Sequence, residues 1–382
     1  MLSAAEDIID KEHSKNKTSD EKNCPSESGT RHCDGRISTG TVLLADILPN
    51  LIVKILVMFF GQNARHGIRH FFVVSLQAVA VSVVAISENY YITLSGVVLS
   101  SISCGIGEST LVSYSSHFPH STTVAFTSGQ GTSGVLGSFI YAALTEPHLA
   151  NLSLKATFLI MLIVPCIYGA TFWLILDHPG NLWFIFKNKE KTFDYSKAER
   201  IVEKRQTTLV EKMRLIQPLI HFIFPMVIVY LAEYTINQGF IQLIVFKCAN
   251  AFHLSKKSQY RWFQVIYRTG TFISKSSLIL VNFPIWMLYV FPFLQIGNAL
   301  FFYFEALKAF LPHISIAFVV ILVAGLFGGS SLVKTLNHIH KTIPTDIREF
   351  SLAVITTADT IGIVMAAFTA IWLHNVICDQ LG

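Results

Sequence analysis

The chain has 382 residues, of which 52% are hydrophobic, only 14% are charged and 30 are phenylalanine. One soluble core cannot bury that much apolar surface, which excludes an ordinary soluble globular protein and leaves lipid as the surroundings of the excess. The formal charge of +5 is small, and the basic residues lie between apolar runs rather than along one surface, so nucleic acid is not an expected partner.

Residues 1–40 are rich in Lys, Ser, Glu and Asp and contain too few large apolar residues to fold alone, which predicts a polar tail or long loop. After them come apolar runs near the length of about 20 residues that a helix needs to cross a hydrocarbon core. The predicted spans are 41–60, 70–87, 91–113, 122–145, 155–177, 218–246, 262–281, 284–304, 312–334 and 350–373. The sequence therefore predicts an all-α polytopic membrane protein, a bundle of about ten transmembrane helices in two halves.

A hydrophilic segment at 179–217 separates the first predicted spans from the last ones. It divides the chain into a polar lumenal segment at 1–40, an N-terminal helical bundle at 41–178, a cytosolic basic loop at 179–217 and a C-terminal helical bundle at 218–382. A weak sequence similarity between Gly105–Val112 and Leu326–Val333 is compatible with a transporter built from parallel repeats. Chance similarity between two apolar strings rich in small residues is the alternative.

Lysine and arginine residues set the predicted orientation, because they are retained on the cytosolic side of a membrane. They are concentrated in the 179–217 loop and recur in the 61–69 loop, so both loops are predicted to be cytosolic. Alternation then places the 1–40 segment, the 146–154 and 247–261 loops and the C-terminus on the lumenal side. Two glycosylation sequons, at Asn16 and Asn151, fall on that same side, and we predict that both carry glycans.

The six cysteines show neither a C-x-x-C pair nor the spacing of a zinc site, so we expect no metal and no cofactor. Cys24 and Cys33 both lie in the polar N-terminal segment. In an oxidising compartment they would form a disulfide, and two unpaired thiols are the equal alternative.

The first span carries Asp46, Asn50 and Lys54 at i, i+4 and i+8, which places them on one stripe of the helix beside Pro49. Holding an ionised residue in the middle of a membrane costs about 2.5 to 3.5 kcal/mol, so such residues usually face a polar cavity or one another. The stripe therefore predicts either the lining of a pathway or an internal bridge between Asp46 and Lys54 that only neutralises the helix.

Two further acids interrupt apolar spans. Glu108 follows Gly105-Ile-Gly107, where the missing side chains leave room for water or a neighbouring helix, although a place at the cytosolic boundary is the alternative. Asp359 lies midway along the last span. Together with Asp46, both acids are candidates for proton coupling.

Glu233 in the sixth span is the sharpest candidate for proton coupling. Tyr230, Glu233 and Asn237 recur at i, i+3 and i+7, with Gln238 adjacent, in an otherwise apolar helix. Removal from water disfavours the charged form of a carboxylate, so Glu233 is suited to exchange protons near lumenal acidity. The alternative is that these polar side chains only hold neighbouring helices together.

The seventh span places Gln264, Arg268 and Lys275 at i, i+4 and i+11 on one face, with Tyr267 beside them. Two cations on one inward face predict an anionic substrate group, since phosphate and carboxylate are the usual partners of Arg and Lys in a cavity. Snorkelling of a cation to a membrane interface is the alternative, and it suits Lys275 better than Arg268. The predicted substrate-binding residues are Arg268, Lys275, Gln264, Tyr267, Asn237 and Gln238.

Several strings of the chain resemble those of the battenin family, over nearly the whole sequence. They are Met1–Ala5, Val42–Pro49, Ala232–Gly239, Gln259–Trp262, Ser274–Ser277, Arg348–Phe350 and Ala358–Gly362. The resemblance implies a major-facilitator-like fold, residence in the lysosomal or vacuolar membrane, a part in lysosomal pH, autophagy and basic amino-acid balance, and clearance of glycerophosphodiesters. It also implies that this chain begins at the lumenal end of the family's first transmembrane helix.

The predicted function is a secondary carrier with an alternating-access cavity between the halves, in which Arg268 and Lys275 hold a small anionic solute and Glu233 exchanges protons. The alternative is a membrane scaffold or trafficking factor that binds cytosolic proteins through the 179–217 loop. An enzyme is not expected, because the chain lacks the Tyr-Asp and Gly-x-Gly-Asp motifs of an intramembrane protease and a Gly-x-Ser-x-Gly elbow. It also lacks a nucleotide-binding loop, so ATP-driven transport is not expected.

Overall fold

The structure is a computed structural model that describes residues 2–13, 33, 38–60, 66–115, 120–176, 209–277 and 284–381. Within these ranges the chain is helical and contains no β-strand. A helix occupies each of the predicted spans, which confirms the expected all-α membrane architecture. The spanning elements are α2 (Thr39–Phe60), α3 (His66–Ile86), α4 (Tyr90–Ser115), α5 (His120–Thr145), the run of α6 (Leu154–Met161), α7 (Ile163–Ala170) and η4 (Thr171–Ile175), α9 (Ile220–Thr235), α10 (Lys256–Ser276), α11 (Met287–Lys308), α12 (Ile314–Thr342) and α13 (Thr345–Leu381).

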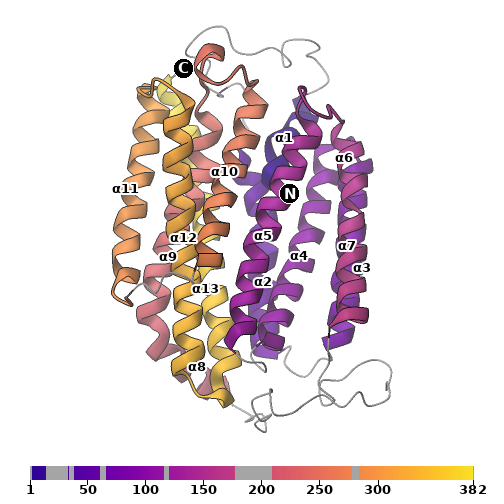
Figure 1. Ribbon diagram of the computed structural model, residues 1–382, viewed down its shortest axis with the longest axis vertical. Helices are drawn as coiled ribbons and strands as arrows, with labels where there is room; N and C mark the ends of the chain where they lie inside the picture. Colours follow the sequence, from indigo (N-terminus) through magenta and orange to yellow (C-terminus); the bar gives the residue numbers. More distant parts are fainter. Residues whose placement is uncertain are drawn as a thin grey trace.

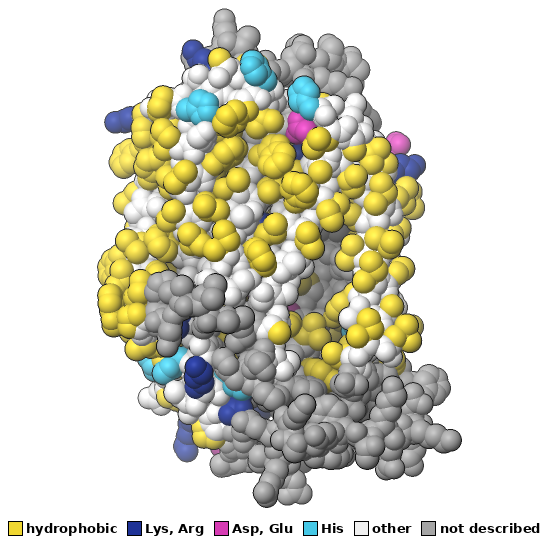
Figure 2. Space-filling model, in the orientation of Figure 1, with side chains coloured by type: hydrophobic (Ala, Val, Ile, Leu, Met, Phe, Trp, Pro, Cys, Tyr) yellow, Lys and Arg dark blue, Asp and Glu magenta, His cyan; other side chains and the backbone are white. Residues whose placement is uncertain are grey.

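Polar composition sets α5 and α10 apart from the other spanning helices. Eight of the described helical runs are long and apolar enough to cross a membrane, and neither α5 nor α10 is among them. α5 is rich in Gly, Ser and Thr, and α10 carries Lys, Arg and Gln residues along its length. Both lie along the other helices in the middle of the bundle, whereas the outer surface at mid-height is mostly hydrophobic (Figures 1 and 2). Of the polar residues that the structure describes in these two helices, all except Ser133 are buried or half-buried.

The helices form two sides that meet along α5 and α10. In Figure 1, α2 to α7 lie on one side of the bundle and α9 to α13 on the other. α5 packs along α10, and α2 packs along α13. The short helix α1 (Ala5–His13) and the C-terminus lie toward the upper end of Figure 1, and α8 (Leu209–Ile216) lies at the lower end. The predicted orientation would make the upper end lumenal; that orientation and the four segment boundaries remain predictions.

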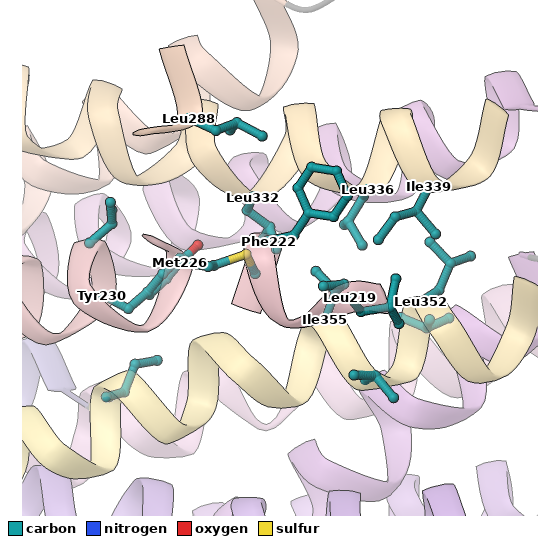
Figure 3. Close-up of a cluster of buried hydrophobic side chains, with 14 of the residues drawn as sticks. Leu219, Phe222, Met226, Tyr230, Leu288, Leu332, Leu336, Ile339, Leu352 and Ile355 are labelled. Carbon is teal, nitrogen blue, oxygen red and sulfur yellow. The ribbon is translucent and has the colours of Figure 1, made fainter. Parts of the chain in front are cut away.

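A cluster of apolar side chains fills the lower part of the second side. The residues labelled in Figure 3 are at most 8% exposed, and they are Leu219, Phe222, Met226, Tyr230, Leu288, Leu332, Leu336, Ile339, Leu352 and Ile355. Most of them come from α9, α12 and α13. Because close-packed interiors resist deformation, this cluster holds α9, which carries Glu233, in a fixed position against the two other helices.

α10 and α12 cross with their backbones in contact. A Cβ atom at Gly270 would meet the carbonyl oxygen of Leu322, and one at Gly325 would meet the carbonyl oxygen of Tyr267. A backbone atom cannot move aside as the end of a flexible side chain can. The position of Tyr267 and Arg268 in the interior therefore depends on the absence of side chains at this crossing.

We expect Gly270→Ala to lower the stability of the protein by about 1–3 kcal/mol, the usual cost of overpacking. The added methyl group would push α10 away from α12. Thermal unfolding of the purified protein in detergent measures the effect. Gly297→Ala on α11 is the matched control, because an added Cβ there meets nothing within 4 Å. Equal losses in the two variants would show that the crossing is not the cause.

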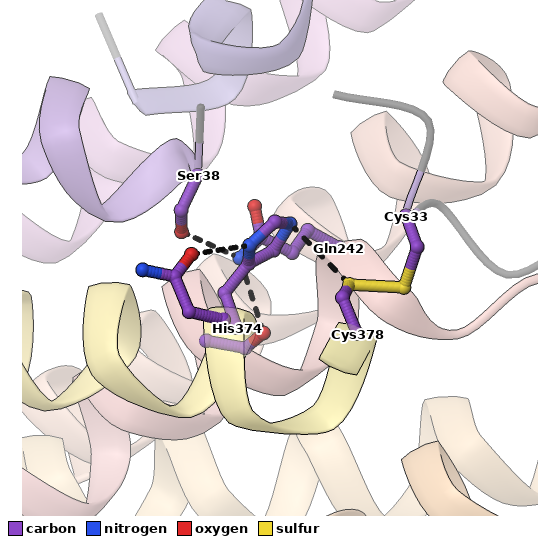
Figure 4. The surroundings of a disulfide bond; sticks show 7 residues. Cys33, Ser38, Gln242, His374 and Cys378 are labelled. Atoms are coloured by element: carbon purple, nitrogen blue, oxygen red, sulfur yellow. Dashed lines mark hydrogen bonds between the residues drawn. A yellow bond between two sulfur atoms is a disulfide. The ribbon is translucent and has the colours of Figure 1, made fainter. Parts of the chain in front are cut away.

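A disulfide bond joins Cys33 to Cys378 near the end of α13, with a Cα–Cα distance of 5.4 Å (Figure 4). Both expectations for Cys33, a bond to Cys24 or an unpaired thiol, are therefore wrong; Cys24 itself lies outside the described residues. The fold brings together two cysteines that are 345 positions apart in the chain. Beside them, the Gln242 side-chain amide donates to the Ser38 hydroxyl at 2.8 Å. Disulfides persist in oxidising compartments, which agrees with the predicted lumenal side of both segments.

The first residues of the chain differ from the expected tail. Residues 2–13 form η1 (Leu2–Ala4) and α1, and Ala4, Ala5 and Ile8 are each at most 1% exposed. With Ile9 they form one apolar face that packs against α2, α4 and α5. The spacing of these four residues is that of an amphipathic helix. This spacing would have predicted the helix, but the average composition of residues 1–40 is polar and does not indicate it.

Candidate functional site

Lys54 of α2 lies at the centre of an ion network between the two sides of the bundle. Its side chain is 4% exposed, and its Nζ atom lies 2.8 Å from Glu108 Oε2 on α4 and 3.8 Å from Asp359 Oδ1 on α13. The ammonium also donates to the main-chain oxygen of Thr356 at 2.8 Å and to the hydroxyl of Thr360 at 2.7 Å. One cation thus joins α2 and α4 of the first side to α13 of the second.

The members of the predicted stripe on α2 face different neighbours. The alternative of an internal bridge between Asp46 and Lys54 is wrong, because the carboxylate partners of Lys54 come from α4 and α13. Asp46 instead lies within electrostatic range of Arg268 on α10. The main-chain N–H of Asn50, one turn away, donates to the Ser101 hydroxyl on α4 at 2.9 Å.

Glu108 is the more open of the two acids that hold Lys54. Its carboxylate also accepts a hydrogen bond from Gln130 Nε2 on α5 at 3.3 Å, so it lies among three helices of the bundle. The Glu108 side chain is 17% exposed, whereas that of Asp359 is 9% exposed. A proton or a water molecule therefore reaches the network more readily at Glu108.

Side chains beside this network are partly accessible to solvent. Cys104, one turn before Glu108 on α4, is an exposed thiol, and the charged groups that act on it are Glu108, Asp46 and Lys54. Its exposure is therefore toward the interior and not toward lipid. Just below lies a pocket, whose polar lining residues are Lys54, Arg69, Ser109, Ser113, Glu349 and Thr357. Figure 2 shows the visible face hollowed in its lower half, beside α5.

The predicted cationic face of α10 is turned toward this interior. The Arg268 guanidinium lies 5.1 Å from the centre of the Tyr267 ring, a cation–π contact. Gly134 of α5 lies against the Arg268 side chain, and Gly131 of α5 lies against Lys275. Arg268 and Lys275 are both only partly buried. The absence of side chains at these two glycines thus lets two cationic side chains lie against α5, at the contact between the two sides.

Glu233 is completely buried where α9 meets α12. Its carboxylate lies so close to Gly328 that a Cβ atom there would overlap it. The Tyr267 phenol interacts with this carboxylate, yet neither oxygen accepts a hydrogen bond of good geometry. Arg268 and Lys275 lie within electrostatic range. A buried carboxylate with so few hydrogen bonds is costly as an anion, so its environment suits a group that takes up a proton.

The two amides of the predicted solute site have separate surroundings. Both lie in η6 (Ile236–Phe240), a π-helical turn that continues α9, and such turns are frequent at functional sites. The Asn237 side chain donates to the main-chain carbonyl oxygen of Glu233 at 2.9 Å. The main-chain carbonyl oxygen of Asn237 accepts from Gln264 Nε2 at 3.2 Å. The Gln238 side chain instead accepts from the Tyr260 hydroxyl at 3.1 Å. Asn237 and Gln264 therefore belong with Glu233, and Gln238 does not.

Several residues of the site escape sequence reasoning. Gln130 lies in a helix rich in small polar residues, so its amide does not stand out in the sequence as a candidate site residue. At the upper end, Asp7 of α1 contacts Tyr141 of α5 and Arg261 of α10. Arg261 does lie in the string Gln259–Trp262 that carries the family resemblance, but nothing in its spacing indicates a partner near the start of the chain.

Asn151 is exposed in the loop between α5 and α6, at the upper end of the molecule. This position is compatible with the predicted glycan, which stays a prediction. Asn16 lies outside the described residues.

The sequence model of the family described as CLN3 protein matches residues 1–380. The chain belongs to the CLN3 protein family. The resemblance to battenins is thereby confirmed, and individual relatives agree with it. Battenin of the dog (Canis lupus familiaris) is 33% identical over 389 residues, which cover 99% of this chain and 87% of that protein. Protein btn-1 of Neurospora crassa is 30% identical over 385 residues, with 89% and 82% covered.

Two solved structures have a fold similar to that of this CLN3-family chain. One is a bacterial homolog of the human lysosomal transporter Spinster in an inward-facing and unoccupied conformation, with a TM-score of 0.52, 13% identity and coverage of 87% of this chain and 74% of that one. The other is the human organic anion transporter MFSD10 (TETRAN), with a TM-score of 0.53, 11% identity and coverage of 90% and 84%. The predicted major-facilitator-like fold is confirmed.

Proposed function

We propose that this CLN3-family chain is a secondary transporter that carries a small anionic solute by alternating access between its two sides. The observation that supports this most directly is the position of Arg268 and Lys275, two cations that lie half-buried where α5 of one side meets α10 of the other. Cations in the middle of a membrane protein are costly unless an anion accompanies them. A solute with a phosphate or carboxylate group supplies that anion.

The solute we propose is a glycerophosphodiester, carried across the lysosomal or vacuolar membrane. The battenin relatives support the location, and one protein of similar fold is described as an organic anion transporter. The two free oxygens of a phosphodiester match the planar fork of Arg268. Tyr267 is almost fully buried, so its proposed part is to hold the Arg268 guanidinium in place through the face of its ring.

Proton coupling would act through the acids that surround Lys54 and Glu233. Lys54 supplies one positive charge to Glu108 and Asp359, which lie on opposite sides of the bundle. A proton on either acid removes the attraction of that acid for Lys54 and so weakens the ionic link between α2 and the helix concerned. Asp46, within electrostatic range of Arg268, is a further candidate. A carrier that moves protons with its solute would influence lysosomal pH, and through it autophagy and basic amino-acid balance.

Flux of a labelled glycerophosphodiester across proteoliposomes, with and without an imposed pH gradient, tests this function. We expect Glu233→Gln to keep flux down the solute gradient but to lose the acceleration by the pH gradient, because glutamine has the same shape and cannot bind a proton. Glu88→Gln, at the exposed turn between α3 and α4, is the matched control and should keep the full pH effect.

Absence of flux for the glycerophosphodiester, and separately for labelled arginine, would contradict transport. In that case the scaffold alternative predicts that deletion of the 179–217 loop abolishes the cellular function while Glu233→Gln leaves it intact. Most of that loop lies outside the described residues.

A further inference from the structure

One carboxylate near the start of the chain is held by donors from both sides of the bundle. Asp7 Oδ1 lies 2.6 Å from an Nη atom of Arg261, and Asp7 Oδ2 lies 3.1 Å from its Nε, so the guanidinium on α10 binds the carboxylate with two parallel hydrogen bonds. The hydroxyl of Tyr141 on α5 donates to Asp7 Oδ2 at 2.6 Å. Three donors from two helices therefore converge on a single anion.

This junction covers the upper end of the contact between α5 and α10. Arg261 is 8% exposed, also donates to the Thr145 carbonyl oxygen on α5 at 3.3 Å, and lies 5.9 Å from the centre of the Tyr141 ring. The apolar face of α1 is buried beside it. Arg268 and Lys275 lie farther down the same two helices. Separation of α5 from α10 at the upper end must therefore move α1 and break the contacts of Asp7.

We propose that Arg261 and Tyr141 form an anion-binding site at the upper end of the proposed solute pathway. Asp7 occupies this site while that end is closed, and the anionic group of the solute takes the place of Asp7 when it opens. The inference rests on the proposed transport function and adds a second contact point for the same solute.

The physical reason is the burial of Arg261. Removing the partner of a buried charge is strongly unfavourable, because the remaining charge keeps its desolvation cost without compensation. A phosphodiester or carboxylate presents two oxygens in the same fork geometry as Asp7, so it can replace the lost hydrogen bonds. A neutral or cationic solute cannot. The site would thus make opening depend on the solute and would select for anions.

Thermal unfolding of the purified full chain at increasing inorganic phosphate, with chloride at matched ionic strength as reference, tests the site. Asp7→Asn keeps the shape of the side chain and removes the charge that competes for Arg261. We expect the half-saturating phosphate concentration to fall about tenfold in Asp7→Asn, since hydrogen bonds to charged groups are the strong ones. The gain should disappear in the double variant with Arg261→Gln. Glu88→Gln, an exposed acid at the same end, should behave as the wild type.

A glycerophosphodiester titrated in place of phosphate should show the same gain in Asp7→Asn. A gain with phosphate alone would overturn the part of the proposal that concerns the solute.

A second measurement remains if Asp7→Asn does not fold. Tyr141→Phe removes one of the three donors, and Cys104 in a Cys166→Ser background reports access to the interior. We expect a membrane-impermeant thiol reagent added from the upper side to label Cys104 several times faster in Tyr141→Phe than in the parent. An unchanged phosphate response in Asp7→Asn, or unchanged labelling where only Tyr141→Phe folds, would overturn the site. Flux that still depends on Arg268 would then leave the transport function standing.

Discussion

Lys54→Gln is expected to abolish solute flux and to lower the stability of the protein by about 3–5 kcal/mol, the usual cost of removing one partner from a buried ion pair. Glutamine keeps most of the length of the side chain but cannot neutralise Glu108 and Asp359, which lie 2.8 Å and 3.8 Å from the ammonium. The two acids would then repel each other inside the bundle. The link between α2, α4 and α13 would be lost together with the charge.

Thermal unfolding and proteoliposome flux measure the two effects separately. Adding Asp359→Asn to Lys54→Gln should recover part of the stability, because it removes one of the unpaired charges, but should not restore a pH effect on flux. Lys308→Gln, at the exposed end of α11, is the control, and we expect its stability to lie within about 0.5 kcal/mol of the wild type. Wild-type stability and flux in Lys54→Gln would show that the network contributes to neither property.

Arg268→Ala is expected to raise the KM for an anionic solute by roughly tenfold to a hundredfold, which corresponds to the loss of charge-assisted hydrogen bonds worth about 1.5–3 kcal/mol. The guanidinium is the cation with the more defined position, because it stacks on the Tyr267 ring at 5.1 Å. Arg268→Lys keeps the charge but not the planar fork, so it should recover only part of the affinity.

The dependence of flux on solute concentration gives KM for each variant. Lys308→Ala removes a cation from the exposed end of α11 and should leave KM unchanged. If Arg268→Ala binds the solute as the wild type does while Lys275→Ala does not, the anion contacts the lower cation and the role assigned to Arg268 is wrong.

The polar groups are arranged differently above and below the ion network. Above it, α1 covers the contact of α5 with α10, and Asp7 joins Tyr141 to Arg261. Below it, a polar pocket lies directly beside Lys54. With the predicted orientation, this conformation is closed toward the lumen and has its polar pocket on the cytosolic side.

Much of the candidate site could be predicted because charged residues in apolar helices stand out. Glu108, Glu233, Arg268 and Asp359 each interrupt an otherwise apolar or inward face, and the structure places all four inside the bundle. The spacing of Gln264 and Arg268 on one face of α10 was likewise readable from helical periodicity. Their roles in proton coupling and solute binding stay predictions.

The interaction partners of these side chains were much harder to predict than their positions inside the bundle. For Lys54 the sequence offered Asp46 on the same helix, because i and i+8 lie on one stripe, and the structure instead supplies Glu108 and Asp359 from other helices. For Cys33 it offered the nearby Cys24, and the structure supplies Cys378. In both cases the local candidate was wrong, since a side chain at a helix crossing interacts with whatever the neighbouring helix presents there.

The sequence by itself determined that this chain is a bundle of membrane helices with a charged interior, because lipid tolerates neither exposed backbone nor unpaired ions, and both requirements leave a local pattern. The tertiary structure alone decided which charges meet. Asp7 and Arg261 are 254 positions apart and Cys33 and Cys378 are 345 apart, so their contacts depend on the rotation and offset of whole helices. Those two quantities arise from packing over the entire length of each helix, and no short stretch of residues encodes them.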